Sequence, residues 1–328
     1  MILGYKETVS IKIFFMSYTY KVFIYIVLIL LNLVLIIITT TPDAKASNIK
    51  DSAVVYMYHK FGIGKYPSTN ITLEQFESHL KEFSKEKYNV VSLDYIINSF
   101  RTQTKLPKNT IGISIDDGDK SVITEAWPRM KKYGFPLTVF VSTEPIDAKL
   151  SNYMSWDDIR SLKSEGVQIG AHTRTHAHLT ELAVNEIKNE IEYSNKRFLS
   201  EIYEVPQLFA YPYGETSMQV INIIKDYKFK AAFGQHSGVI NETSDFNYLP
   251  RFSLNEKYGN IDRVIFSANA KGIGVYDFVP ADPLLSENPP FIGFSLLDKK
   301  LAETLNCFIF DSKGNVEIEQ YIFGERVE

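Results

Sequence analysis

The sequence predicts an α/β fold in which parallel strands alternate with helices and form a barrel, followed by a small β appendage. Three observations support this fold class. Short β-like runs alternate with helical patterns from Ala53 to about Phe233, an order typical of a parallel sheet wrapped by helices. The number of these β/α units suggests a barrel. Beyond about Asp282 only strand-like runs remain, which predicts the appendage.

The individual elements follow from local patterns. The expected barrel strands are short apolar runs at Val54–Tyr58, Asn89–Ser92, Thr110–Ile115, Leu137–Val141, Val167–Ala171, Gln207–Tyr211 and Lys230–Phe233. Helix starts are indicated by capping residues at Thr72 with Gln75, at Ser155 with Asp158 and at Thr216 after Gly214. The appendage strands are expected at Phe291–Leu296, Leu305–Phe310 and Val316–Ile322, with a turn at Asp311–Asn315.

The first 46 residues differ from the rest of the chain. Val22–Ile38 is apolar except for Asn32, and Ala44-Lys45-Ala46 is the small-x-small pattern that signal peptidases cut. We therefore expect residues 1–46 to be a cleaved signal peptide or, if uncut, an N-terminal membrane anchor formed by residues 22–38. Either alternative predicts an exported protein, in a periplasm or at an extracellular face. The expected domains are 1–46, a barrel at 47–281 and the β appendage at 282–328.

Composition excludes one class of partner. The net charge is −4 and the sequence pI is about 5.9, whereas a nucleic-acid-binding domain needs a basic face or stripe. We expect no nucleic-acid partner, and nothing in the sequence implies a protein partner.

Polar residues follow several of the expected strands. His59 follows the first strand, Asp116 and Asp117 follow the third, His172 ends the fifth, and Tyr211–Gly214 follow the sixth. Because the C-terminal ends of barrel strands meet at one face, these residues are expected to converge there.

Two clusters among these residues indicate a metal centre. Adjacent carboxylates at a strand end, Asp116 and Asp117, are costly to hold together unless a cation or proton separates their charges, although Asp-Asp-Gly is also a common surface turn. His172 and His176, four residues apart at the expected mouth of a helix, point the same way and can share one metal. One Asp and two His with an open position describe a catalytic site better than a closed structural one. His178 is expected to turn away from the metal.

The chain resembles the polysaccharide deacetylase family, which has the nodulation-type deacetylase domain (carbohydrate esterase family 4). Ser114-Ile-Asp-Asp-Gly118 is similar to its first motif, His172-Thr-Arg-Thr-His176 to its second and Tyr211-Pro-Tyr-Gly214 to the core of its third. The resemblance covers about Val54 to Phe252. It implies a deformed (β/α)7 barrel, metal ligation by Asp117, His172 and His176, and Asp116 as the catalytic base. It also implies an oxyanion held by the metal and the backbone N–H of Tyr213.

Two departures from the family pattern point to one subgroup. The third motif usually begins with an Arg that orients the base, and Ala210 stands there; the late Leu-x-His motif that supplies the acid is missing. In the exported poly-N-acetylglucosamine deacetylases the acid comes from an N-terminal Met-Tyr-His stretch, which Met57-Tyr58-His59 resembles. Leu249-Pro-Arg-Phe252 is similar to that subgroup as well, and Arg251 could replace the missing Arg.

The resemblance implies a metal-dependent hydrolase that removes N-acetyl groups from an N-acetylglucosamine-containing polymer or oligosaccharide of the poly-N-acetylglucosamine, chitooligosaccharide or peptidoglycan type. The alternatives are an O-acetyl esterase of the xylan type and a non-catalytic sugar-binding module. One divalent cation is expected, zinc first, with Co²⁺, Ni²⁺ or Fe²⁺ as alternatives. Aromatic residues near the rim are candidates for sugar stacking as well as for core packing; with the neighbouring proline, the substrate-binding candidates are Tyr58, Tyr211, Pro212 and Trp156.

Overall fold

The computed structural model describes residues 49–311, 314–316 and 318–328. The expected signal peptide or anchor at residues 1–46, with its apolar run 22–38, lies outside the described residues. Within the described ranges, no helix has both the length and the apolar character that a bilayer crossing requires.

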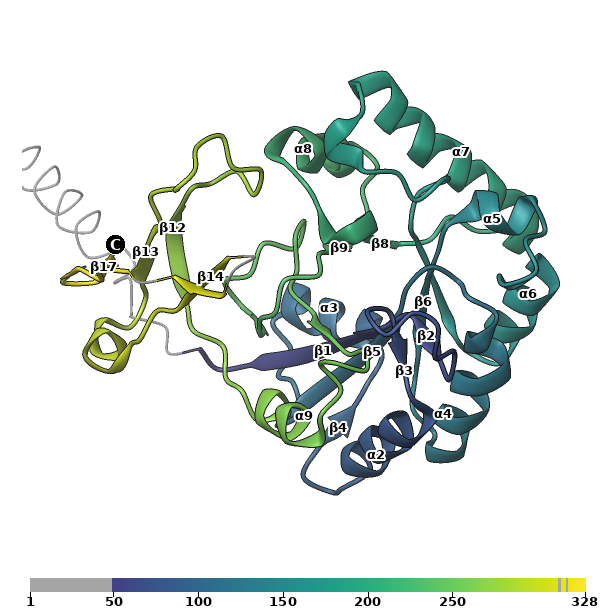
Figure 1. The fold of residues 1–328 in the computed structure, drawn as a ribbon, viewed down its shortest axis with the longest axis horizontal. Helices are drawn as coiled ribbons and strands as arrows, with labels where there is room; N and C mark the ends of the chain where they lie inside the picture. Colours follow the sequence, from purple (N-terminus) through teal and green to yellow (C-terminus); the bar gives the residue numbers. More distant parts are fainter. Residues whose placement is uncertain (1–48, 312–313, 317) are drawn as a thin grey trace, which may run out of the picture. The chain divides into compact units, whose positions relative to one another are not determined.

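A curled parallel sheet forms the centre of the fold (Figure 1). Its strands, in spatial order, are β1 (Ser52–Tyr58), β5 (Thr110–Ile115), β6 (Thr138–Val141), β7 (Gln168–Ala171), β8 (Leu208–Ala210) and β9 (Ala231–Phe233). All five neighbouring pairs along this path are parallel. The predicted barrel class is confirmed, because the sheet curls and the C-terminal ends of its strands share one face.

The segment from Leu249 to Ser253 joins the two edges of this curled sheet. Leu249 bridges in parallel to Phe233 of β9, and β11 (Phe252–Ser253) pairs in parallel with β1. The strand expected at 89–92 is present in a shorter form, β4 (Asn89–Val90), which pairs in parallel with the start of β5. Strand β1 lies directly beside β5. The short β10 (Ile240–Asn241) runs antiparallel to the start of β1.

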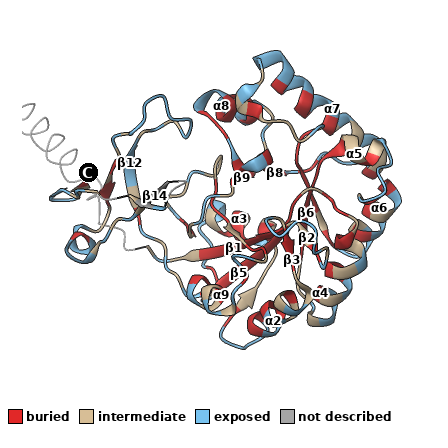
Figure 2. Cartoon of the chain, in the orientation of Figure 1, coloured by how far each residue is buried: buried red, intermediate tan, exposed pale blue. Residues whose placement is uncertain are grey.

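Helices pack against both faces of the curled sheet (Figure 1). They are α2 (Leu73–Phe83), α3 (Leu93–Thr102), α4 (Trp127–Tyr133), α5 (Thr143–Asp147), α6 (Trp156–Ser164), α7 (Val184–Ile202), α8 (Met218–Asp226) and α9 (Ile261–Ala268). Alternate strand residues belong to two different core clusters: Val54 and Tyr56 pack with apolar residues of the helices other than α3, whereas Val55 packs with Leu93, Ile96 and Ile97 of α3. Burial on both faces explains why the strands appear red along their length in Figure 2 and read as continuous apolar runs.

Two of the three predicted helix caps are present. Thr72 forms a capping box with Gln75 at the start of α2, and Ser155 forms one with Asp158 at the start of α6. The third prediction is off by one residue. Ser217, not Thr216, caps α8, because its side chain accepts a hydrogen bond from the Val220 N–H.

A second sheet lies in the C-terminal part of the chain. Its order is β12 (Val275–Val279), β13 (Gly293–Leu296), β17 (Arg326–Val327) and β16 (Ile322–Phe323), and all its pairs are antiparallel. A separate hairpin consists of β14 (Ile309–Asp311) and β15 (Gly314–Val316). The second sheet includes β12, which precedes residue 282, and the division of the chain into domains at 47–281 and 282–328 stays a prediction.

Candidate active site

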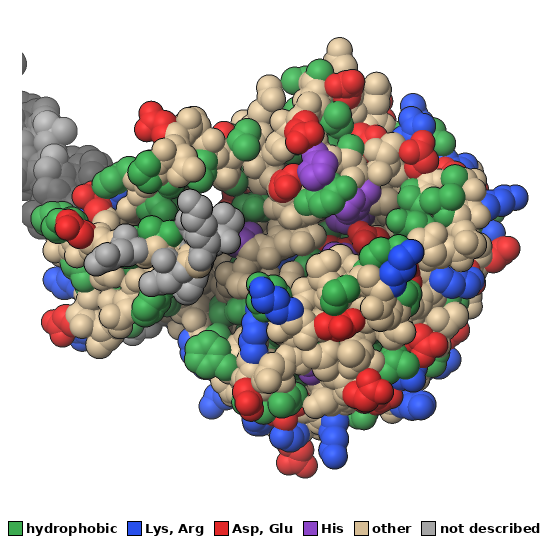
Figure 3. Space-filling model, in the orientation of Figure 1, with side chains coloured by type: hydrophobic (Ala, Val, Ile, Leu, Met, Phe, Trp, Pro, Cys, Tyr) green, Lys and Arg blue, Asp and Glu red, His purple; other side chains and the backbone are tan. Residues whose placement is uncertain are grey.

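The residues expected at the site come from the C-terminal ends of four strands of the curled sheet. His59 follows β1, Asp116 and Asp117 follow β5, His172 follows β7, and the turn at Pro212–Gly214 follows β8. Figure 3 shows histidine side chains gathered around a hollow in the face that is viewed. The parallel register therefore brings together groups that are up to about 150 residues apart in the sequence.

Three of these side chains converge on one point. Oδ1 of Asp117 lies 3.5 Å from Nε2 of His172 and 3.3 Å from Nε2 of His176, and one ligand atom from each of the three residues lies within 4.8 Å of the others. In a tetrahedral zinc site with bonds of about 2.0–2.1 Å, ligand atoms lie about 3.3 Å apart. Oδ1 of Asp117 and Nε2 of His172 are buried and have no hydrogen-bond partner among the described residues. These residues therefore fit a divalent cation.

The orientation of His172 suits a ligand. The ring is fully buried, and its Nδ1 lies 2.7 Å from the carbonyl oxygen of Ala210. Because a carbonyl can only accept, Nδ1 carries the proton and the lone pair is on Nε2, which faces Asp117. Ala210, the residue that departs from the family pattern, thus orients a predicted ligand through its backbone.

His176 approaches the same point through a loop and not through a helix. The sequence predicted that the two histidines lie at the mouth of a helix, and this is wrong: residues 172–178 contain no helical turn. Thr173 and His176 have φ values of 65° and 64°. The left-handed conformation costs a non-glycine residue about 1–3 kcal/mol, so surrounding contacts must hold it. The hydroxyl of Thr173 contributes by accepting the His176 N–H at 3.1 Å.

Asp116 lies beside this point and is held by Arg251. Nη1 and Nη2 of Arg251 donate to the two carboxylate oxygens of Asp116 at 2.7 Å each, and both side chains are fully buried. Nε of Arg251 also donates to the Gly234 carbonyl at 2.8 Å. Burial alone would raise the pKa of Asp116, but the positive charge of Arg251 outweighs it, and the pKa is lowered. Asp116 is therefore an ionised carboxylate whose position is fixed.

The electrostatics around Asp117 favour a positive charge. Burial would raise the pKa of Asp117, but His172 and His176 together lower it well below its usual value. Burial also opposes the charged form of His172, yet the carboxylates of Asp117 and Asp116 raise its pKa overall. A proton or a cation between these groups is thus stabilised by two carboxylates.

A cavity of about 340 Å³ opens beside these residues, and it is lined by His59, Asp117, His176 and Tyr213 together with Ser68, Thr69, Gln235, Ser253, Leu254, Asn255 and Tyr258. Burial lowers the pKa of His59, and the nearby Asp117 and Asp116 act in the opposite direction. The ring of Tyr213 is 45% exposed and lies edge-on to His176, with centroids 4.5 Å apart.

Three of the predicted substrate-binding residues lie in the core. Tyr58 and Tyr211 are fully buried, and their hydroxyls contact Nδ1 of His79 and the Asn247 carbonyl. Pro212 is buried in the turn after β8. None of the three lines the cavity. Of the two alternatives that the sequence left open for Tyr58 and Tyr211, sugar stacking and core packing, the structure shows core packing, because both side chains belong to the larger core cluster.

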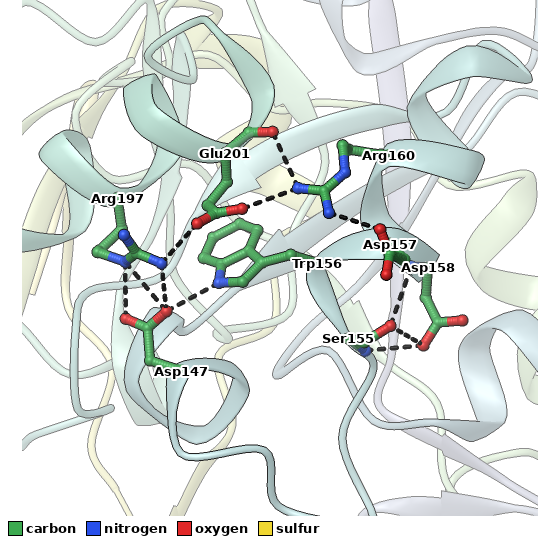
Figure 4. A network of polar contacts seen from close by, with 8 residues as sticks. All are labelled: Asp147, Ser155, Trp156, Asp157, Asp158, Arg160, Arg197 and Glu201. Atoms are coloured by element: carbon green, nitrogen blue, oxygen red, sulfur yellow. Dashed lines mark hydrogen bonds and ion pairs between the residues drawn. The ribbon is translucent and has the colours of Figure 1, made fainter.

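Trp156 is also a structural residue. Its indole N–H donates to Asp147 at 2.8 Å, and its ring lies edge-on to Phe198. Figure 4 shows Trp156 within a polar network that links α5, α6 and α7, in which Arg197 donates to both carboxylate oxygens of Asp147. The predicted place of Trp156 at the sugar-binding rim is therefore wrong.

His178 is outside the metal cluster, as expected. Its ring is stacked on Tyr213 at 3.8 Å, and Nδ1 lies 2.7 Å from Glu215. No sequence motif indicated Gln235, Asn255 and Tyr258, which form part of the cavity wall and come from loops.

Comparison with known proteins shows similarity to polysaccharide deacetylases over part of the chain. Residues 103–232 match the family model described as polysaccharide deacetylase. YxkH of Bacillus subtilis is 25% identical over 168 residues, which cover 51% of this chain and 58% of YxkH. The match therefore spans little more than half the length of that relative. A poly-β-1,6-N-acetyl-D-glucosamine N-deacetylase of Staphylococcus aureus is 24% identical over 200 residues, covering 57% of this chain and 68% of that protein.

Solved structures share the fold. The deacetylase PplD of Streptococcus pyogenes, solved in complex with acetate, superposes with a TM-score of 0.62 at 16% identity, over 67% of this chain and 99% of PplD. IcaB from Ammonifex degensii superposes with a TM-score of 0.59 at 21% identity, over 67% of this chain and 98% of IcaB.

Proposed function

Because residues 103–232 match the family model described as polysaccharide deacetylase, we propose that this protein is a metal-dependent hydrolase that removes N-acetyl groups from an N-acetylglucosamine-containing polymer or oligosaccharide. One observation carries the proposal. The three convergent atoms of Asp117, His172 and His176 lie next to a fixed, ionised Asp116, and two of these residues, Asp117 and His176, line an open cavity. A sugar-binding module would need neither a buried charged base nor three ligand atoms aimed at one point.

The proposed substrate is a poly-N-acetylglucosamine type of chain. This is supported by the Staphylococcus aureus relative, which is named for that substrate. It is also supported by the position of His59 directly after β1, where it lines the cavity together with residues that follow β11. Chitooligosaccharide and peptidoglycan are the related substrates that the same chemistry would serve.

Asp117, His172 and His176 would hold the cation, with zinc as the first choice and Co²⁺, Ni²⁺ or Fe²⁺ as alternatives. When bound, a divalent cation would polarise the acetyl carbonyl and lower the pKa of an attacking water. Asp116 accepts the proton of that water, and Arg251 keeps its carboxylate ionised and correctly oriented. The backbone N–H of Tyr213 is the proposed donor to the carbonyl oxygen as negative charge develops there.

His59 completes the proposed reaction. The bond between the acetyl carbon and the sugar nitrogen breaks, and the nitrogen leaves as an amine after it receives a proton from His59. Burial lowers the pKa of His59, which makes its protonated form a strong donor. The products are acetate and a free amino group on the sugar.

We further propose that the protein is exported, with residues 1–46 serving as a signal peptide or as a membrane anchor at residues 22–38. The apolar run and the Ala-Lys-Ala pattern support this proposal. The catalytic barrel would occupy 47–281 and the β appendage 282–328.

Acetate release tests the proposed function. The purified protein is incubated with N-acetylglucosamine oligomers, or with an O-acetylated xylan, in the presence of zinc or of a chelator. We expect acetate from the oligomers only when zinc is present, and none from Asp116→Asn, which should still bind zinc because Asp116 is not a ligand. Acetate from xylan alone would support an O-acetyl esterase. Acetate from neither substrate would support a binding module, and an active Asp116→Asn would contradict the role of the base.

A further inference from the structure

The loop that carries His176 is enclosed by two helices outside the cavity. Its residues His172 to His176 have no regular secondary structure, so their backbone groups need partners from elsewhere. The start of α5 provides donors: the N–H groups of Thr143 and Glu144 donate to the carbonyls of Thr173 and Arg174 at 3.3 and 2.9 Å. The Ser142 hydroxyl donates to the His172 carbonyl at 2.7 Å.

The N–H groups of the same loop are held from the other side by one acid. Oε2 of Glu190 accepts the N–H groups of Arg174 and Thr175 at 3.0 and 2.8 Å, and Oε1 accepts the Thr175 hydroxyl at 2.9 Å. Glu190 is on α7 and only 8% exposed. Glu190 makes no ion pair with any described residue, and the guanidinium of nearby Arg174 pairs with Glu144 instead. The polar contacts observed for Glu190 are thus its hydrogen bonds to Arg174 and Thr175 of the loop.

The two helices that enclose the loop are themselves joined. Arg197 of α7 donates to both carboxylate oxygens of Asp147 at the end of α5, at 2.9 and 3.0 Å from Nε (Figure 4). Arg174 of the loop reaches Glu144 of α5 at 2.7 Å, and its guanidinium lies over the ring of Tyr193 of α7. These contacts hold α7, and with it Glu190, in place beside the loop. Shortening the Glu190 side chain should therefore change the position of the loop backbone.

The two histidines depend on this support unequally. His172 is buried and oriented by the Ala210 carbonyl, whereas His176 is partly exposed and follows the left-handed residue Thr173 and the two N–H groups that Glu190 binds. We propose that Glu190 is a positioning residue that sets the place of His176 and thereby the affinity of the site for its cation. This inference rests on the proposed metal site.

Two substitutions separate positioning from charge. Glu190→Asp keeps the negative charge but withdraws the carboxylate by one methylene group, so it cannot reach both N–H groups. Glu190→Gln removes the charge but places an amide oxygen where Oε2 lies. Replacement of residues that orient metal ligands typically costs 10- to 100-fold in metal affinity. If position is what matters, we expect Glu190→Asp to weaken cation binding about tenfold or more and Glu190→Gln to change it little.

The experiment measures zinc affinity of the purified full-length protein by competition with a chromophoric chelator, and the unfolding temperature of the cation-free protein. Glu192→Gln, an exposed position on the same helix, is the control and should bind like wild type. Wild-type affinity in Glu190→Asp would overturn the proposal, even if its unfolding temperature falls, because that would be a purely structural role. Weaker zinc binding by Glu190→Gln than by Glu190→Asp would also overturn the proposal, because it would show that the negative charge of Glu190 matters more than the position of its oxygen atoms. A wild-type protein that binds no zinc would instead contradict the proposed function.

Discussion

Arg251 and Asp116 form a bidentate ion pair in which both side chains are fully buried and both N–O distances are 2.7 Å. The two residues are 135 positions apart. They meet because the segment from Leu249 to Ser253 lies between β9 and β1, which places Arg251 beside the end of β5. Planar, two-point contact fixes the orientation of a carboxylate as well as its charge.

The first prediction concerns Arg251→Lys. A lysine keeps the charge but cannot make two parallel hydrogen bonds, so Asp116 should lose its orientation. We expect kcat for acetate release to fall on the order of 10²-fold, the size of effect that a 1 Å misplacement can produce. Hydrogen bonds from Arg251 help to lower the pKa of Asp116, so the loss of one of them in Arg251→Lys should raise the pKa of that carboxyl. The acidic limb of the pH–rate profile should therefore move to higher pH.

Steady-state kinetics across a pH series would measure both effects of Arg251→Lys. The variant should stay folded, since a positive charge still faces Asp116, and chemical denaturation checks this. A folded Arg251→Lys variant with wild-type kcat and an unchanged acidic limb would show that Arg251 controls neither the orientation nor the pKa of Asp116.

The second prediction compares two neighbouring histidines. Nε2 of His176 lies 3.3 Å from Oδ1 of Asp117, whereas His178 stacks on Tyr213 and pairs with Glu215. We expect His176→Ala to lose stoichiometric zinc and His178→Ala to retain it. Metal content after dialysis, measured by atomic emission, distinguishes the two variants. Retention of zinc by His176→Ala, or its loss from both variants, would show that the cation is held elsewhere.

The third prediction concerns stability at low pH and His79. This residue is fully buried; its Nε2 contacts the Gly259 carbonyl and its Nδ1 contacts the Tyr58 hydroxyl. Because the carbonyl must accept, Nε2 carries the proton and Nδ1 accepts from Tyr58, so a second proton has no place. Burial accordingly lowers the pKa of His79 below 6.5.

A folded-state pKa below the unfolded one means that the unfolded chain binds the extra proton first. The free energy of unfolding should therefore fall as pH drops below about 6.5, until the folded-state pKa of His79 is reached. His79→Gln cannot take up this proton, so we expect a shallower loss of stability over that range, although the variant starts from a lower stability at neutral pH. Urea denaturation at several pH values measures the slope. Equal slopes in the two proteins would exclude His79 as a cause.

Much of the site could be predicted from local sequence. Apolar runs marked the strands, and a rule about strand ends then placed Asp116, Asp117 and His172 at one face. The aromatic residues could not be assigned in this way. Whether Tyr58, Tyr211 or Trp156 faces a cavity or the core depends on the twist of each strand and on neighbouring helices, and the spacing of residues along the chain does not specify either.

The amino-acid sequence by itself determined the class of fold and the ligand types, because strand and helix periodicity are local and because a metal site requires particular side chains. Only the tertiary structure decided how these groups are held. It showed that a loop with left-handed residues, and not a helix, brings His176 to Asp117, that the Ala210 carbonyl orients His172, and that Glu190 holds the loop. Such contacts join residues through space, and they are specified by the closure of the sheet and the packing of α5 and α7 and not by any one segment.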